Sequence, residues 1–343
     1  IITIVLLNVV TAFIFTAMMG AGPVIAIGVI VLPILMSLGI PKAIAMFTFM
    51  GSVSAGMYLN PVLQFSQLRA FICASDEMPE FSFSWYTSHW GIYALIISVV
   101  VVSVLTGIYL KIGKKSHAWA AQAAPKNTQT DAPLIALILP IVPVVLKIWL
   151  DFSVIGGFVI AGFAALFLCG KMNKSFKENC QLVNKLYYDG VVDTAPLVGF
   201  LLTLPMFNTC ASYASPYFKE VLGGIMPTNE YVVCALFAAL SILGFFRGPL
   251  TLYGCGAATL GVLSAVGHFS VPFLFCVFTI PATTVNVGSC ITQSWIAWGL
   301  AYTKVESRDY LKLSIPFAYI CSILLYILTA FTVTGLGPEW FLS

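Results

Sequence analysis

Long apolar stretches dominate the chain, and short polar segments separate them. A helix that crosses a bilayer needs about 20 apolar residues, and several of these stretches come close to that length. The predicted spans are Ile1–Met19, Pro23–Leu38, Ala43–Leu59, Gly91–Leu110, Leu134–Leu150, Phe152–Cys169, Pro196–Met206, Tyr231–Phe246, Tyr253–Val266, Val271–Ile280, Ile291–Tyr302 and Ile315–Thr334. This pattern predicts an all-α polytopic membrane protein.

Composition excludes a soluble enzyme. Of the 343 residues, 60% are hydrophobic and 8% are charged, whereas soluble domains carry about 45–50% apolar and about 25% charged residues. The net charge of +3 is too small to indicate a nucleic-acid partner. No nucleotide-binding or protease motif occurs in a suitable context. We therefore expect no enzymatic activity, no cofactor and no metal centre. Because the chain opens with Ile1 inside an apolar run, we also expect missing N-terminal spans.

Charged residues in three segments predict the orientation in the membrane. The segments Lys111–Asp131 and Lys171–Asp189, which we interpret as loops, are rich in lysine, whereas Val62–Trp90 is acidic. The positive-inside rule places the two lysine-rich segments in the cytoplasm and the acidic one outside. We interpret 111–132 as a cytoplasmic linker between a first half, 1–110, and a second half, 133–343.

The two halves contain an internal repeat. A shift of 226 residues, the spacing of Asn60 and Asn286, superimposes several identical residues. The matches are Gly22-Pro23 with Gly248-Pro249, Gly28 with Gly254, Phe47 and Phe49 with Phe273 and Phe275, Asn60 with Asn286, and Gln67 with Gln293. In both copies an apolar segment runs into a break rich in small and polar residues, Gly51–Pro61 in the first half and Pro281–Ser294 in the second.

Matching breaks in two halves are typical of the substrate site of a secondary transporter. Irregular backbone at membrane depth is tolerated only where protein or a watery cavity satisfies it. The alternative is that the small residues simply allow helices to pack closely. We expect helix N-termini at the breaks to hold an anion such as a carboxylate, and backbone carbonyls to hold Na⁺ as a coupling ion. The candidate substrate-binding side chains are Ser52, Ser54, Asn60, Thr283, Thr284, Asn286, Ser289, Thr292 and Gln293, and Asn60 and Asn286 are also candidates for ion coupling.

Two charged residues near the apolar spans are further candidates. Arg247 lies between two spans, where it needs an anionic partner, a carbonyl or water. Its guanidinium fits a substrate carboxylate, and the alternative is a helix-end arginine that pairs with a carbonyl or a lipid. Asp193 is a candidate for coupling to H⁺ or Na⁺, although an aspartate that caps a helix is the favoured explanation.

Three stretches resemble the ion transporter superfamily. They are Gly20–Pro41 with the break that follows, Phe246–Ala257, and Gly288–Ala301 with Lys304-Val305-Glu306. The most similar branches are the citrate–metal/proton symporters, the gluconate permeases and the anaerobic C4-dicarboxylate carriers. The resemblance implies two inverted repeats with re-entrant hairpins and interrupted helices. It also implies a homodimer and an elevator-type motion. The Ser-Asn-Thr signature of the divalent-anion/sodium branch is absent.

The sequence thus predicts a symporter of a small organic anion, driven by H⁺ or Na⁺, in the bacterial inner membrane. Its partners would be the anion and the lipid bilayer. A cation antiporter of related fold, with Asp193 as ion ligand, is one alternative. A membrane scaffold that transports nothing is another.

Overall fold

A computed structural model gives the fold of most of the chain. It describes residues 2–73, 80–112, 133–143, 146, 152–173, 175–192, 206, 210, 213, 217, 220, 227–267 and 269–336. Every regular element in these ranges is helical, which confirms the all-α prediction. The chain divides into two compact units, with Ile1–Gln122 and Phe207–Ser343 in unit 1 and Ala123–Met206 in unit 2.

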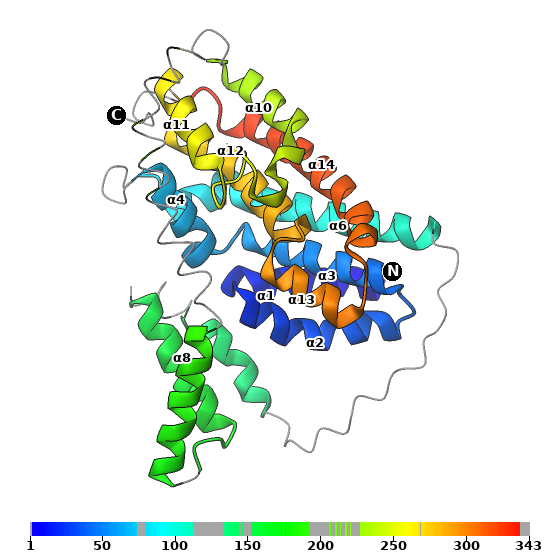
Figure 1. The fold of residues 1–343 in the computed structure, drawn as a ribbon, viewed down its shortest axis with the longest axis vertical. Coiled ribbons are helices and arrows are strands. Elements are labelled where there is room, and N and C mark those ends of the chain that lie inside the picture. The colour runs from blue at the N-terminus through cyan, green and yellow to red at the C-terminus, as the bar shows by residue number, and fades with distance from the viewer. Residues whose placement is uncertain are drawn as a thin grey trace. The chain divides into compact units, whose positions relative to one another are not determined.

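Unit 1 contains two series of helices in the same order (Figure 1). The first series is α1 (Ile2–Ala17), α2 (Ala21–Ser37), α3 (Lys42–Met57), η1 (Pro61–Phe65), α4 (Ser66–Ile72), α5 (Phe83–Tyr86), η2 (Thr87–Gly91) and α6 (Ile92–Ile112). The second series is α10 (Glu230–Ala239), η4 (Ser241–Arg247), α11 (Gly256–Val266), α12 (Val271–Ile280), η5 (Pro281–Val287), α13 (Ser294–Thr303) and α14 (Ser307–Thr332). α10 and η4 can be counted as one bent helix, and α5, η2 and α6 as one long helix. Each series then has two helices, a third helix that runs into a break, a short helix, and a long final helix.

The third helix of each series is the most buried. In α3 every residue from Ile44 to Met57 is buried, and so is every residue of α12 and η5, from Val271 to Val287. Neither segment has an apolar face and a polar face, which is typical of a helix surrounded by protein. α3 packs against α1 and α6, and α12 packs against α10 and α14. The short helices cross over between the series, because α13 packs on α3 and α4 packs on α12.

The long final helices α6 and α14 lie side by side and antiparallel. Trp90, just before α6, donates from Nε1 to Thr329 Oγ1 at 3.0 Å, near the C-terminal end of α14. At the other end, the Tyr109 hydroxyl donates to the Leu313 carbonyl at 3.0 Å. The chain therefore crosses unit 1 in opposite directions in its two series.

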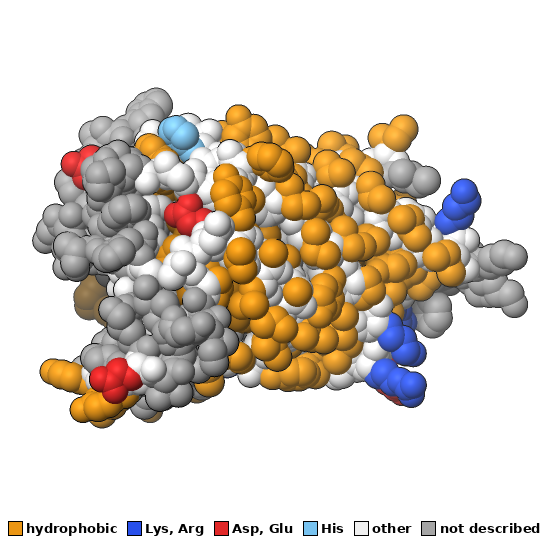
Figure 2. All heavy atoms as spheres, turned by 90° about the horizontal axis from the view of Figure 1, so that it is seen from above, with side chains coloured by type: hydrophobic (Ala, Val, Ile, Leu, Met, Phe, Trp, Pro, Cys, Tyr) orange, Lys and Arg blue, Asp and Glu red, His pale blue; other side chains and the backbone are white. Residues whose placement is uncertain are grey.

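Two described helices are long and apolar enough to cross a membrane, Phe83–Ile112 and Ser307–Thr332. Glu230–Ala239 and Ser241–Arg247 would together form a third, bent by 64°. Other predicted spans appear as shorter apolar helices: Ile2–Ala17, Ala21–Ser37, Gly156–Leu168 and Val271–Val287. On the face shown in Figure 2, a broad band of apolar side chains lies between one end with Lys and Arg and another with Asp, Glu and His.

Some predicted boundaries differ from the structure. The last span was predicted from Ile315, but α14 begins at Ser307. Its first turns carry the exposed polar residues Arg308, Asp309 and Lys312. The prediction followed apolar residues alone and missed a polar helical end. Pro196–Met206 and most of Leu134–Leu150 lie outside the described residues.

Unit 2 contains η3 (Leu134–Ile141), α8 (Val154–Leu168) and the helical segment 176–192. The sequence predicted a loop over Lys171–Asp189. This prediction is wrong for most of the range, because residues 176–192 are helical. Apolar residues recur there at helical spacing, at Phe176, Cys180, Val183 and Tyr187. This spacing indicates an amphipathic helix. The lysines between the apolar positions led to the prediction of a loop instead.

Candidate substrate and ion site

The first break is shorter than predicted. Gly51–Met57 continues α3 as regular helix, and only Tyr58, Leu59 and Asn60 separate α3 from η1. The two serines of this stretch donate to their own helix, Ser52 to the Thr48 carbonyl at 2.8 Å and Ser54 to the Gly51 carbonyl at 2.9 Å. Ser52 and Ser54 are buried within the helix rather than in irregular backbone.

Close packing explains the glycines of this stretch. A Cβ on Gly51 would lie 2.7 Å from Val102 of α6, and a Cβ on Gly56 would lie 2.1 Å from the Ala12 carbonyl oxygen of α1. Both distances are shorter than real Cβ contacts allow. For Gly51 and Gly56, the packing alternative from the sequence is therefore correct.

The second break is also shifted. Pro281 was predicted to interrupt the helix, but α12 continues through it as the π-helix η5 to Val287. The break itself runs from Gly288 to Gln293. It is held by Tyr310, whose hydroxyl donates to the Gly288 carbonyl at 2.7 Å, and by Trp295, whose Nε1 donates to the Val287 carbonyl at 3.2 Å. Ser289 donates to the Thr284 carbonyl at 3.0 Å. π-Turns of this kind are frequent at functional sites.

The two breaks meet inside unit 1. Tyr58 and Thr284, whose spacing equals the repeat shift, form a buried hydrogen bond of 2.5 Å between their hydroxyls. A Cβ on Gly288 would lie 2.6 Å from the Ser54 hydroxyl, so the backbone just after η5 packs against a side chain near the end of α3. Thr284, one of the predicted substrate-binding residues, thus contacts the end of the other broken helix.

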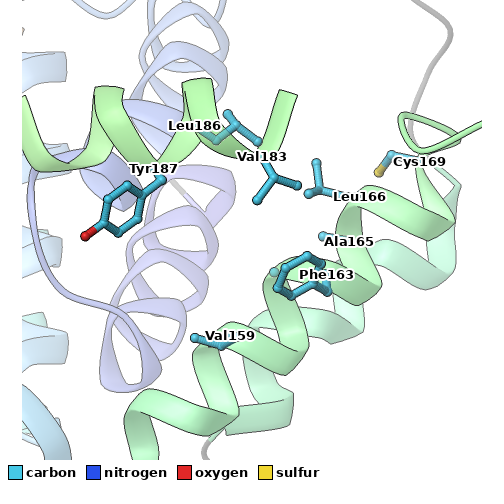
Figure 3. Close-up of a pocket in the computed structure, with 9 residues that line it drawn as sticks. Val159, Phe163, Ala165, Leu166, Cys169, Val183, Leu186 and Tyr187 are labelled. Carbon is cyan, nitrogen blue, oxygen red and sulfur yellow. The ribbon is translucent and has the colours of Figure 1, made fainter. Parts of the chain in front are cut away.

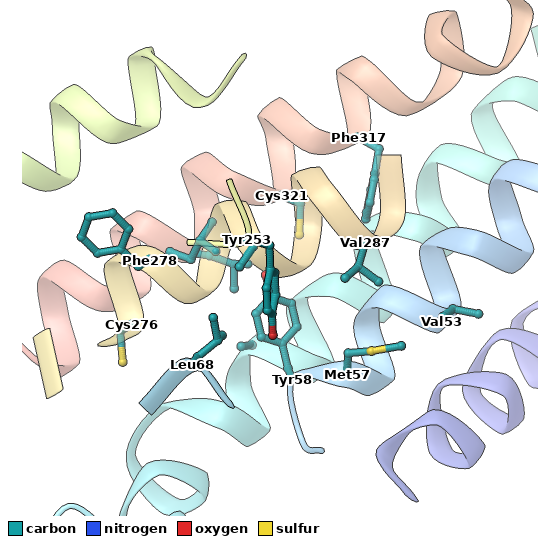
Figure 4. Packing of buried hydrophobic residues seen from close by; sticks show 14 of the residues in the cluster. Val53, Met57, Tyr58, Leu68, Tyr253, Cys276, Phe278, Val287, Phe317 and Cys321 are labelled. Carbon is teal, nitrogen blue, oxygen red and sulfur yellow. The ribbon is translucent and has the colours of Figure 1, made fainter. Parts of the chain in front are cut away.

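Gln64 and Tyr253 extend this junction, although neither was among the residues predicted from the sequence. Gln64 donates from Nε2 to Thr283 Oγ1 at 2.6 Å, and the Tyr253 hydroxyl donates to Gln64 Oε1 at 3.3 Å. Figure 4 shows the rings of Tyr58 and Tyr253 pointing into the space between the broken helices. A glutamine in an apolar segment directly after Pro61 was the signal available in the sequence. The repeat drew attention to Gln67 instead, which is only half-buried.

Cys321 of α14 is a further residue that the sequence did not indicate. Thr284 donates to its Sγ at 3.8 Å, and Ser98 of α6 lies 3.4 Å from the same sulfur. The junction is therefore tied to both long helices.

The two candidate asparagines differ in their surroundings. Asn60 accepts from the backbone N–H groups of Val62 at 3.2 Å and Gln64 at 3.5 Å, so it caps η1. Asn286 is fully buried, and neither its Oδ1 nor its Nδ2 has a hydrogen-bond partner. An unpartnered buried polar group costs about 1–3 kcal/mol, so such a residue requires an explanation.

The structure describes three of the four remaining candidates. Gln293 is buried at the start of α13, whereas Thr292 is exposed and its hydroxyl lies 3.0 Å from Cys290 Sγ. Arg247 is half-buried and donates from Nη1 to the Tyr253 carbonyl at 3.0 Å. Asp193 lies outside the described residues.

The loop around Arg247 is held in a strained conformation. Phe246 and Arg247 both have positive φ, 54° and 59°. The Arg247 carbonyl accepts from Cys255 N at 3.1 Å, and a Cβ on Gly254 would lie 2.1 Å from that same carbonyl oxygen. The loop therefore fixes Arg247 and Tyr253 relative to each other, next to the polar junction.

The helix ends that meet are C-terminal. The sequence predicted that two helix N-termini would face each other, but the meeting ends are Ser54–Tyr58 at the end of α3 and Thr284–Gly288 at the end of η5. Helix C-termini carry partial negative charge and favour cations. The N-terminus of α13, which favours anions, follows directly after the second break, whereas the N-terminus of η1 is capped by Asn60. The helix ends that meet therefore favour a cation.

No family model matches this chain, and no curated protein or solved structure matches it either.

Proposed function

We propose that the protein is a secondary active transporter of a small organic anion, driven by H⁺ or Na⁺. The observation that carries the proposal is the buried polar junction of two broken helices, one of which, η5, also carries the buried and unpartnered amide of Asn286. Transporters place substrate and coupling ions where discontinuous helices end near the middle of the membrane. An amide that can donate and accept suits both a carboxylate and a cation.

The arrangement of unit 1 supports an inverted repeat. The two series have the same element order, α4 and α13 exchange places between them, and α6 and α14 are antiparallel. A two-fold axis in the membrane plane relates repeats of this type, and residues on such an axis contact their own equivalents. Tyr58 and Thr284 are such a pair, since the repeat shift relates them and they share a hydrogen bond.

The charged ends support a membrane-spanning arrangement. Lys111 at the end of α6 and Arg308 and Lys312 at the start of α14 belong to one end of the antiparallel pair, whereas Glu80 and His89 precede α6 at the other end. The positive-inside rule places the basic end in the cytoplasm. We propose a multi-pass protein of the bacterial inner membrane that acts as a homodimer with an elevator-type motion.

One observation favours a second candidate, a cation antiporter of related fold. The helix ends that meet are C-terminal and therefore favour a cation. A membrane scaffold is the weaker alternative, because packing alone gives no reason to bury an unpartnered amide such as Asn286.

Replacing Arg247 with lysine tests whether this arginine binds the substrate. Lysine keeps the charge but loses the planar fork that pairs with a carboxylate. Losing a charged hydrogen bond weakens binding by about 10- to 150-fold. We therefore expect Arg247→Lys to raise the KM for carboxylate uptake in proteoliposomes by that factor, with thermal stability little changed.

Arg308→Lys is the matched control, since Arg308 lies on the exposed first turn of α14, and its KM should equal that of the wild type. An unchanged KM in Arg247→Lys would leave Arg247 as a residue that only holds the loop through the Tyr253 carbonyl.

A further inference from the structure

Unit 2 contains an apolar groove that the transport site does not use. The groove has a volume of about 460 Å³ and lies between α8 and the helical segment 176–192 (Figure 3). Its lining includes Val159, Phe163, Leu166, Val183, Leu186 and Tyr187. Figure 3 shows Val183 and Leu166 close together at one end of the groove, whereas Val159 and Tyr187 lie farther apart at the other. Its volume is in the range of small-molecule sites, which is about 300–1,000 Å³.

The groove is open along its length. A Cβ on Gly162 would meet nothing within 4 Å. Phe163 is 47% exposed and Tyr187 is 71% exposed. Large apolar side chains gathered on an open groove indicate a surface that an apolar partner covers.

Two lysines lie where the chain passes from α8 to segment 176–192. α8 ends at Leu168, the chain turns at Gly170, which has φ +65°, and the Lys171 N–H donates to the Leu166 carbonyl at 2.9 Å. Because Leu166 lines the groove, this bond fixes the Lys171 backbone at the groove end. Lys177 lies in the first turn of segment 176–192, and Asn179 ties that turn to the Met172 carbonyl at 2.9 Å. Both lysines are exposed, and neither forms an ion pair with a described residue.

We propose that this groove binds an anionic phospholipid, with one acyl chain along the groove and the phosphate at Lys171 and Lys177. The chemistry of the groove matches the two parts of such a molecule, since it is apolar along its length and cationic at one end. Lysines next to membrane helices attract anionic head groups, and anionic lipids bind in basic pockets of this kind. The two lysines favour an anionic lipid over a zwitterionic lipid or a second copy of the chain, because neither of these needs positive charge at the end of the groove. The proposal does not depend on the transport function.

Native mass spectrometry of the full chain in detergent tests the proposal. The probes are phosphatidylglycerol and phosphatidylcholine with identical acyl chains. We expect tighter binding of phosphatidylglycerol, and a loss of about fivefold in its affinity for each of Lys171→Gln and Lys177→Gln. Lys185→Gln is the matched control, because Lys185 lies on the same segment but farther along the chain than Lys177 from the Leu166 end of the groove, and it should leave the affinity unchanged.

A second variant tests the acyl-chain contact. Gly162→Leu should fill the groove and weaken both lipids, whereas Gly107→Leu on α6, where a side chain also meets open space, should weaken neither. Equal affinity for the two lipids, or no effect of the lysine substitutions, would overturn the proposal. So would a dimer that Gly162→Leu disrupts in the absence of bound lipid, because the groove would then belong to a second copy.

Discussion

Replacing Asn286 with leucine is expected to stabilise the protein and abolish transport. Both polar atoms of the Asn286 side chain are buried without a partner, and leucine has a similar volume and needs none. Removing unsatisfied polar groups should raise the free energy of unfolding by about 1–3 kcal/mol. If the amide binds the substrate or the coupling ion, uptake should fall tenfold or more. Thermal unfolding in detergent and uptake in proteoliposomes measure the two effects.

Asn8→Leu is the matched control for Asn286→Leu. Asn8 is also a buried asparagine, but it lies on α1 away from the breaks and donates to Ser103 at 3.2 Å. Its replacement should lower stability and leave uptake unchanged. Wild-type uptake by Asn286→Leu would show that the junction is not the transport site. Lower stability of that variant would show that the amide has a structural partner.

Replacing Gly56 with leucine is expected to prevent folding. A Cβ at this position would lie 2.1 Å from the Ala12 carbonyl oxygen and 2.9 Å from Phe15 Cβ. α1 and α3 would have to separate, which costs more than the about 1–3 kcal/mol of an ordinary overpacked core. We expect no monodisperse peak in size-exclusion chromatography after solubilisation.

Gly107→Leu is the control for Gly56→Leu, because a side chain at Gly107 meets nothing within 4 Å. It should elute and unfold like the wild type. A well-folded Gly56→Leu protein would contradict the close contact of α1 and α3, and with it the position of the first break.

The sequence predicted most of the helices but placed the breaks less well. α12 begins at Val271, as predicted, because the serine cap Ser270 precedes it, but Pro281 does not end the helix, which continues as η5 to Val287. The first break was predicted over Gly51–Pro61 because its glycines and serines are unfavourable in an isolated helix. Tertiary packing overrides that preference, since Gly51 and Gly56 allow neighbouring helices to approach and Ser52 bonds to its own backbone.

The polar junction could be predicted only in part. Asn286, Thr283 and Thr284 were found because polar residues are rare in apolar segments. Gln64 was missed because the two halves were aligned by one fixed shift. Such an alignment assumes that equivalent residues face the same side of their helices in both halves. The π-turns of η1 and η5 change that phase by adding a residue to a turn. Tyr253 was missed because a tyrosine in an apolar span is ordinary, and only the folded loop brings its hydroxyl to Gln64.

Uptake by the purified wild-type protein tests the central claim most directly. Proteoliposomes would receive labelled mono-, di- and tricarboxylates under an imposed Na⁺ or pH gradient, with an ionophore that collapses the gradient as the control. If the protein is a secondary transporter of carboxylates, at least one carboxylate should accumulate above its external concentration, and the ionophore should abolish this accumulation. Uptake no greater than in protein-free liposomes, for every carboxylate and both gradients, would contradict it.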